Sequence, residues 1–218
     1  MLCLSGLARC GVAHGFGVRG AADPPGLLRP RQVHGARVVT ADECRGAPPP
    51  EADAVICFEA RVPVGVVTAD CVPVLIASER GDAVAAVHAG WRGLAAGVVA
   101  QSVDALRQNG CASRLVAAIG PHIGSCCYEV DGPVLDALTR TFGASAIDAA
   151  SRPVRAGHAL LDLGALTAGA LRQAGLLGED VGTLRGCCTR CDPRRFHSYR
   201  RDGALAGRLS HFVAALQA

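Results

Sequence analysis

Five short runs rich in valine and isoleucine follow one another before the first long helical pattern of this chain. They span residues 37–40, 54–58, 62–68, 72–77 and 83–88, and each is bounded by glycine, proline or aspartate. Runs of this length and composition predict strands. Because several strands precede the first helix, the sequence disfavours a regularly alternating βα chain. It favours a mixed sheet with helices packed outside it.

The later part of the chain is predicted to be richer in helices. Apolar residues recur close to the helical period over residues 94–108, 163–174 and 204–216, and residues 133–142 begin with a proline, as helices often do. Residues 115–119 and 181–184 predict two further strands. The length of 218 residues fits one domain, and aromatic residues make up only 4%, so the core is expected to be aliphatic.

Arginine supplies all 22 basic residues, and lysine is absent. The chain therefore has no Schiff-base lysine, no pyridoxal-phosphate anchor and no P-loop lysine. Arginine favours bidentate recognition of phosphate and carboxylate, although a GC-rich genome would produce the same bias. The net charge of +3 is too small for a nucleic-acid surface, so we expect no nucleic-acid partner.

We expect neither a membrane span nor a secretion signal. The best apolar stretch, residues 62–77, contains Asp70 and is shorter than the roughly 18 residues of a transmembrane helix. Residues 1–20 lack a basic region followed by an apolar one. Eleven cysteines are an odd number in a chain large enough to fold without disulfides, so we expect reduced thiols and a cytoplasmic protein.

Reactive residues stand at the ends of three predicted strands. They are His34 before the run 37–40, Asp70-Cys71 between two apolar runs, and His88 before a glycine turn and a predicted helix. Two imidazoles and a thiolate would leave the fourth position of a tetrahedral zinc ion open, as catalytic sites do. No local spacing rule selects these three. Each could instead be an ordinary residue: a surface histidine, a core cysteine beside a turn aspartate, or a histidine in a capped turn.

Other segments offer candidates for anion or metal binding. Arg92, beside the predicted helix start, and Arg200 and Arg201, after an aromatic residue, could bind phosphate, although a salt-bridged loop would explain the latter pair. His122 could line a pocket. The cysteines 187, 188 and 191 could form half of a zinc site or a redox pair, but we rate plain loop thiols above both, and Cys126 and Cys127 are equally ambiguous.

Together, these segments resemble the laccase-domain, polyphenol-oxidase-like (YfiH-like) family of purine nucleoside phosphorylases and deaminases. The matching pieces, in family order, are Gln32-Val33-His34-Gly35, Ala69-Asp70-Cys71-Val72-Pro73, His88-Ala89-Gly90-Trp91-Arg92-Gly93, residues 120–130, and residues 198–203 followed by Gly207-Arg208. The resemblance implies a layered α/β/β/α sandwich with mixed sheets, and zinc held by the residues matching His34, Cys71 and His88.

The resemblance also implies an activity and its substrates. It implies phosphorolysis of adenosine, inosine, guanosine and methylthioadenosine, with adenosine deamination as a second activity. We expect Asp70, Cys71 and His88 to be catalytic, with Asp70 orienting a ligand or moving a proton, and Arg92, Arg200, Arg201 and His122 to bind substrate or phosphate. We expect a monomer or a small homo-oligomer. Residues 1–31 form a shorter segment than the family usually carries before the catalytic part, residues 32–218, within one domain.

One alternative to the zinc nucleoside enzyme is rejected, and two remain open. The family's older laccase label implies several coppers, but the chain has seven histidines and no His-x-His pair, so we expect at most copper in the zinc site. A cysteine hydrolase would use Cys71 as nucleophile and His88 as base. A metal-binding interaction module without turnover would fit the shortened first segment.

Overall fold

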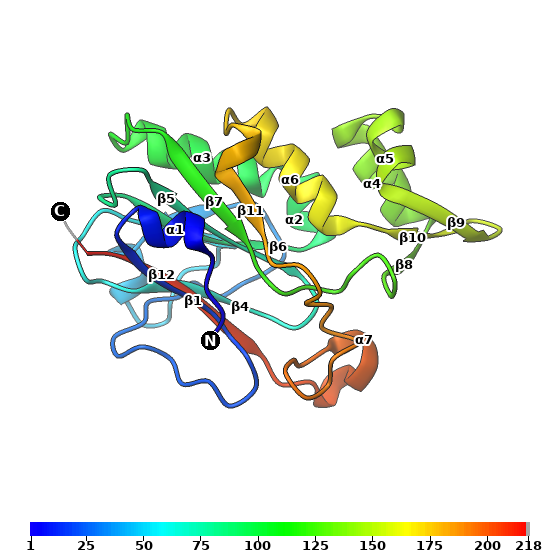
Figure 1. Cartoon of the computed structure of the whole chain (residues 1–218), viewed down its shortest axis with the longest axis horizontal. Coiled ribbons are helices and arrows are strands. Elements are labelled where there is room, and N and C mark those ends of the chain that lie inside the picture. Colours follow the sequence, from blue (N-terminus) through cyan, green and yellow to red (C-terminus); the bar gives the residue numbers. More distant parts are fainter. Residues whose placement is uncertain (217–218) are drawn as a thin grey trace.

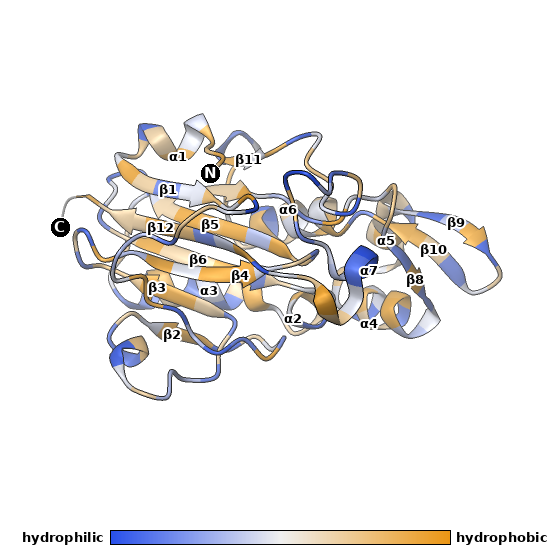
Figure 2. Cartoon of the chain, turned by 90° about the horizontal axis from the view of Figure 1, so that it is seen from below, coloured by the Kyte–Doolittle hydropathy of each residue, from blue (hydrophilic) through white to orange (hydrophobic). Residues whose placement is uncertain are grey.

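A six-stranded mixed sheet forms the centre of the fold, in a computed structural model that describes residues 1–216 (Figure 1). Only the two outer pairs, β11 with β7 and β2 with β3, are parallel. The strand order is β11 (Val181–Thr183), β7 (Leu115–Ile119), β5 (Val72–Ser78), β6 (Val84–Ala89), β3 (Ala54–Cys57) and β2 (Val38–Thr40). Every residue of β3, β5 and β6 is buried, which explains why these strands read as continuous apolar runs (Figure 2).

A second, antiparallel sheet packs on one face of the first. Its strand order is β1 (Val12–Phe16), β12 (Leu209–Ala215) and β4 (Val64–Thr68). The core between the sheets is built from small aliphatic side chains around Phe16, including Val55, Val66 and Leu75. These two stacked sheets form the β/β part of the predicted sandwich.

Helices cover the opposite face of the six-stranded sheet. They are α2 (Trp91–Ala95), α3 (Val98–Gln108) and α6 (Leu163–Gln173), with α4 (Gly132–Phe142) and α5 (Ala144–Ala150) beside them. The antiparallel sheet β8 (Glu129–Asp131), β10 (His158–Leu161) and β9 (Ser151–Arg155) projects at one end (Figure 1). The short helices α1 (Ser5–Arg9) and α7 (Tyr199–Asp202) and the 3₁₀ turns Glu43–Arg45, Gly178–Asp180 and Gly203–Leu205 complete the chain. The layered α/β sandwich with mixed sheets is thereby confirmed.

The predicted helix over residues 204–216 is wrong, because this segment forms strand β12. Leu209, His211 and Val213 are buried while the residues between them are only half-buried, which is the two-residue period of a strand. β12 pairs with β1 on one side and β4 on the other. Those distant partners outweigh the weak helical pattern of a short apolar segment.

The predicted helix over residues 94–108 is interrupted. Gly97 adopts a φ of 83° and separates α2 from α3. A left-handed residue cannot continue a right-handed helix, and glycine adopts this conformation without a Cβ clash. The nine other predicted elements are present, with ends shifted by at most two residues. Five features were not expected from the sequence: α1, β1, α5, α7 and the β8–β10–β9 sheet. None of the helices in residues 1–216 is long and apolar enough to cross a membrane.

Candidate active site

His34, Cys71 and His88 meet at one end of the two stacked sheets. One ligand atom from each lies within 4.8 Å of the others. His34 lies in the loop before β2, Cys71 in the turn between β4 and β5, and His88 near the end of β6. Pro73 of β5 is directly opposite His88, so the strand pairing itself brings the thiol and the imidazole to the same edge.

Asp53, which the sequence analysis did not single out, orders this group. Its fully buried carboxylate accepts a hydrogen bond from Nδ1 of His88 at 2.7 Å. The same carboxylate accepts the backbone N–H groups of His34 at 2.9 Å and Gly35 at 2.6 Å. Burial raises the pKa of Asp53, but the hydrogen bonds from His88 and Gly35 outweigh it, and the net pKa is lowered. The ionised carboxylate fixes both histidine segments and leaves Nε2 of His88 free for a ligand.

The hydrogen bonds within this group favour a thiolate on Cys71 and an imidazolium on His88. Burial raises the pKa of Cys71, but hydrogen bonding to His34 and His88 outweighs this and lowers it to about 6. Burial lowers the pKa of His88, whereas its hydrogen bonds to Asp53 and Cys71 raise it to about 9. A thiolate is the form of cysteine that binds metal or attacks carbon.

Gly90 allows the three side chains to approach one another. A Cβ atom at this position would lie 3.1 Å from Sγ of Cys71 and 3.3 Å from Cδ2 of His34. Both distances are shorter than ordinary van der Waals contacts. The glycine after His88 is therefore part of the site, although it contributes no side chain.

This donor set fits a divalent metal ion with an open coordination position. Thiolate sulfur and imidazole nitrogen are ligands of zinc and copper. Among residues 1–216, no fourth histidine, cysteine or carboxylate joins the group. The three residues line a cavity of about 690 Å³, which gives a ligand direct access to the donor atoms.

Aromatic and arginine side chains form the other walls of this cavity. Trp91, Tyr128 and Tyr199 line it together with Arg31, Arg92, Arg200 and Arg208. Cζ of Arg92 lies 4.3 Å from the Trp91 ring centroid, and Cζ of Arg200 lies 5.3 Å from that of Tyr128. Arg31 pairs with Glu51. By contrast, Arg92, Arg200 and Arg208 form no ion pair with any carboxylate in residues 1–216, so three positive charges remain available to an anion.

Tyr128 retains its proton at neutral pH. Burial, followed by the negative charge on Cys71, raises the pKa of the Tyr128 hydroxyl to about 12. The hydroxyl can therefore donate a hydrogen bond in a cavity that also contains a thiolate.

Asp70 holds the wall that carries Arg200. Its carboxylate accepts hydrogen bonds from Oγ1 of Thr189 at 2.5 Å, Oγ of Ser198 at 3.1 Å and the backbone N–H of Arg200 at 2.6 Å. Asp70 itself has a φ of 93°, a left-handed conformation that is uncommon outside glycine. With three donors engaged, the carboxylate positions α7 and the preceding loop.

The structure does not bring His122 or Arg201 to this cavity. Nδ1 of His122 lies 2.8 Å from the carbonyl oxygen of Gly120, and the ring packs beside Gly164 in a different cavity. The guanidinium of Arg201 donates to the carbonyl oxygen of Thr189 at 2.9 Å and to Asp202. Both side chains serve local contacts.

Gln32 contributes a contact that the motif alone did not reveal. Its side-chain amide donates to the carbonyl oxygen of Val67 at 2.8 Å and accepts the N–H of the same residue at 2.7 Å. Gln32 thus pairs with the edge of β4 as a neighbouring strand would, and it fixes the segment that leads to His34.

The family follows from comparison with known proteins. A family model described as multi-copper polyphenol oxidoreductase laccase matches residues 17–216. The chain belongs to this laccase family. The resemblance predicted from the motifs is thereby confirmed.

Relatives in this laccase family carry names from nucleoside metabolism. The chain is 39% identical over 177 residues to a purine nucleoside phosphorylase of Xylella fastidiosa, covering 79% of this chain and 66% of that protein. It therefore spans slightly less than two thirds of that relative's length. It is 33% identical over 192 residues to an adenosine deaminase from an unknown prokaryotic organism, covering 84% of this chain and 72% of that one. A Bacillus licheniformis hypothetical protein, YfiH, superimposes with a TM-score of 0.83 at 25% identity, covering 94% and 92% of the two chains.

Proposed function

We propose that this chain is a zinc-dependent purine nucleoside phosphorylase, converting adenosine, inosine, guanosine or methylthioadenosine and phosphate to the free base and the pentose 1-phosphate. One observation carries the proposal. Three arginines without a carboxylate partner line the same cavity as the group His34, Cys71 and His88. A phosphorolytic enzyme has to hold an anion beside the bond that it cleaves. The names of relatives support the same reaction class.

The metal would be held by Sγ of Cys71, Nε2 of His88 and one ring nitrogen of His34. When bound, zinc supplies Lewis acidity beside the substrate. Copper could occupy the same donor set, since nitrogen and sulfur sites generally bind copper at least as tightly. The chain's own contribution is Asp53, which fixes the His88 ring and its tautomer.

Phosphorolysis requires one bond to form and one to break at the sugar. An oxygen of phosphate bonds to C1′, and the C1′–N9 bond breaks with its electron pair on the purine. Arg92 and Arg200 line the cavity from α2 and α7, so they can hold the phosphate between them. The protonated hydroxyl of Tyr128, which lines the same cavity, can donate a hydrogen bond to the departing purine or to the ribose.

The aromatic walls suit the flat aromatic ring of a purine base. Trp91 and Tyr128 each have a guanidinium close to the ring, which holds the side chains in place. The exposed side chain of Tyr199 also lines the cavity. Stacking on such rings tolerates different exocyclic groups, which fits a substrate range that includes several purine nucleosides.

The test is incubation of the zinc-loaded protein with adenosine, with and without phosphate, followed by chromatography of the products. We expect adenine only when phosphate is present, and no adenine from Cys71→Ala. Cys3→Ser is the matched control and should retain full turnover, because Cys3 is exposed and lines neither the cavity of Cys71 nor that of Cys188. Absence of the free base from zinc-loaded wild type with every one of the four nucleosides (adenine from adenosine and methylthioadenosine, hypoxanthine from inosine, guanine from guanosine) would overturn the proposal. It would favour an interaction module that binds metal without turnover.

Adenosine deamination is the second candidate, favoured by the relative named adenosine deaminase. Here a water oxygen bonds to C6, and the C6–N6 bond breaks to release ammonia. The reaction needs no phosphate. Inosine appearing at the same rate without phosphate would establish it in the experiment above.

A thiol hydrolase is favoured by the lowered pKa of Cys71 beside His88. Metal dependence separates it from the zinc enzyme, because a metal bound to the thiolate blocks nucleophilic attack. Chelation should abolish adenine formation by the proposed enzyme. Chelation that leaves or increases the activity would favour the thiol mechanism.

A further inference from the structure

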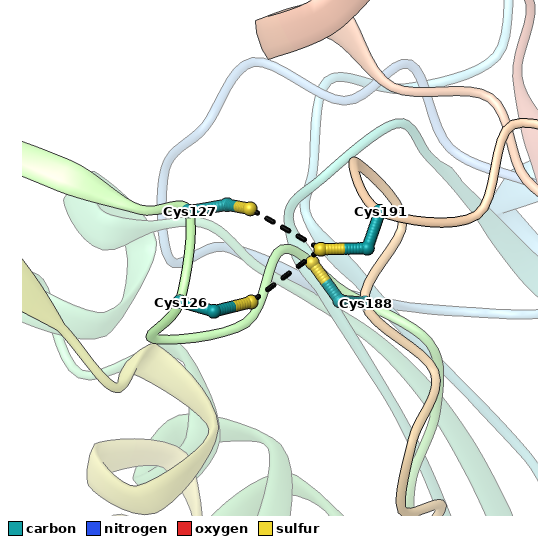
Figure 3. A group of neighbouring side chains, drawn as sticks. All are labelled: Cys126, Cys127, Cys188 and Cys191. Atoms are coloured by element: carbon teal, nitrogen blue, oxygen red, sulfur yellow. Dashed lines mark hydrogen bonds between the residues drawn. The ribbon is translucent and has the colours of Figure 1, made fainter.

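Four cysteines from two distant segments point toward one another outside the candidate active site (Figure 3). Cys126 and Cys127 lie between β7 and β8, and Cys188 and Cys191 lie between β11 and α7. Sγ of Cys191 is 3.6 Å from Sγ of Cys126 and 3.3 Å from Sγ of Cys127. All four sulfur atoms lie within 4.8 Å of one another. We call this group the thiol cluster.

We propose that the thiol cluster binds one Zn²⁺ ion, separately from His34, Cys71 and His88. Four sulfurs in a tetrahedron with zinc–sulfur distances of about 2.3 Å lie about 3.8 Å apart. The two measured separations are within half an ångström of that value. A polynuclear iron–sulfur cluster would spread the same sulfurs over several metal ions and hence further apart. The spacing therefore fits a single ion with four thiolate ligands.

Hydrogen-bond donors around the thiol cluster favour negative sulfur. The backbone N–H of Gly124 donates to Sγ of Cys188 at 3.2 Å, and a guanidinium nitrogen of Arg190 lies 3.5 Å from Sγ of Cys127. Zinc with four thiolates has a net charge of −2. A neighbouring arginine and an N–H donor offset part of that charge, as ligand-supporting groups do in other metal sites.

The thiol cluster lies next to two segments that form walls of the candidate active site. Cys127 directly precedes Tyr128, which lines the cavity. Cys188 and Cys191 flank the segment of Thr189, whose hydroxyl donates to Asp70 at 2.5 Å. The N–H of Thr189 also donates to the carbonyl oxygen of His122 at 3.0 Å, so the two segments are joined by a backbone hydrogen bond next to the thiol cluster. A bound zinc ion would tie these two walls of the candidate active site together while touching no substrate.

Only half of the proposed zinc site has a spacing that is recognisable in the sequence. Cys188 and Cys191 have the spacing of half a zinc site, but the other half is an adjacent pair, Cys126 and Cys127. No second C-x-x-C exists to complete the familiar pattern. The fold supplies the missing half by placing the β7–β8 loop against the loop after β11.

The decisive measurement uses the full-length Cys71→Ala protein, in which the first donor set has lost its thiolate. We expect one zinc ion per chain by metal analysis and an X-ray absorption shell of four sulfurs at about 2.3 Å. Iron in place of zinc, nitrogen or oxygen in the shell, or no metal would each overturn the proposal. So would a mass two hydrogens lower than the reduced chain, which would reveal a disulfide within the thiol cluster.

Variants of the cluster provide the second measurement. Cys191→Ser should lose one zinc equivalent relative to wild type, while Cys187→Ser should lose none. Cys187 is the matched control because it is adjacent in sequence but its Sγ contacts the carbonyl oxygen of Arg185 at 3.3 Å instead. Should Cys191→Ser not fold, the metal count and sulfur shell of Cys71→Ala still decide the question. Failure of nucleoside turnover in wild type would leave this result unaffected, because no substrate enters the measurement.

Discussion

Asp53 and His88 form a buried pair, with Nδ1 of the histidine 2.7 Å from the carboxylate oxygen Oδ1. Their side chains are 0% and 3% exposed, respectively. Because the Nδ1–H of His88 donates to the ionised carboxylate, Nε2 is the ring nitrogen left unprotonated to bind a metal ion. Such carboxylate–histidine pairs orient a metal ligand and raise its basicity. The pair therefore determines how well the candidate active site can bind zinc.

Asp53→Asn should weaken zinc binding at the donor set by about 10- to 100-fold, the usual effect of losing such a partner. The neutral amide of asparagine lacks the negative charge with which the Asp53 carboxylate fixes the Nδ1–H tautomer of His88. Competition against a coloured chelator would measure the affinity. Asp104→Asn, at an exposed position of α3, is the matched control and should leave the affinity unchanged. An unchanged affinity in Asp53→Asn would show that the pair does not support the metal.

Gly90→Ala should reduce zinc occupancy at His34, Cys71 and His88 without unfolding the protein. The added methyl group would lie 3.1 Å from Sγ of Cys71, so the thiol or the turn has to move. Gly169→Ala is the control, since its added methyl group meets nothing within 4 Å in the middle of α6. The control should be stabilised by about 0.5 to 1 kcal/mol, as expected when alanine replaces glycine in a helix. Metal analysis and thermal unfolding would check both; full zinc occupancy in Gly90→Ala contradicts the prediction.

The sequence predicted the central sheet well because its strands are buried on both faces. Val72–Ser78 and Val84–Ala89 are nearly continuous apolar runs of strand length bounded by turn residues, which is the pattern of strands buried on both faces. The β12 segment carries a weaker signal, since its buried residues include His211 as well as Leu209 and Val213. Only pairing with β1 and β4, from distant parts of the chain, determines its structure.

The site residues that could be predicted from the sequence are those whose reactive side chains stand beside an apolar run. Cys71 and His88 follow or end apolar runs, so their reactive groups were visible. Asp53 gave a weaker signal, a lone carboxylate between two alanines at the start of an apolar run. A buried charge there requires several donors. The placement of His122 and Arg201 outside the cavity depends on loop conformations. Loops have no repeating hydrophobic pattern from which their conformation could be predicted.

His211 should make the fold sensitive to acid. The N–H of Gly17 donates to Nδ1 at 3.2 Å, so Nε2 carries the proton and donates to Thr68 at 2.9 Å. Burial lowers the pKa of this fully buried ring from 6.5 to about 3. The unfolded chain therefore binds a proton between pH 6.5 and 3 that the folded chain does not. The stability that neutral, buried His211 contributes is fully present above pH 6.5 and falls as the pH drops through this window, by about 2 kcal/mol from pH 7 to pH 5.

Urea unfolding at pH 7 and pH 5 would measure this loss. His211→Gln, which removes the titrating ring, should lose about 2 kcal/mol less than wild type between the two pH values. His158→Gln, at a half-buried position in β10, should lose as much as wild type. Equal losses in wild type and His211→Gln would show that the buried ring does not cause the acid sensitivity.

Arg92→Gln should raise the KM for phosphate by about 10- to 100-fold, the range for losing a charged hydrogen bond of 1.5 to 3 kcal/mol. The Arg92 guanidinium donates to no acceptor within residues 1–216, and Trp91 holds it 4.3 Å from the ring centroid. Its donors are thus free for an anion in the cavity that contains His88. Steady-state phosphorolysis of inosine at varied phosphate would measure the effect. Arg140→Gln, at the exposed end of α4, controls for the loss of one positive charge and should leave the KM unchanged. An equal rise of KM in both variants would attribute the effect to net charge, whereas no rise in Arg92→Gln would remove this residue from the phosphate site.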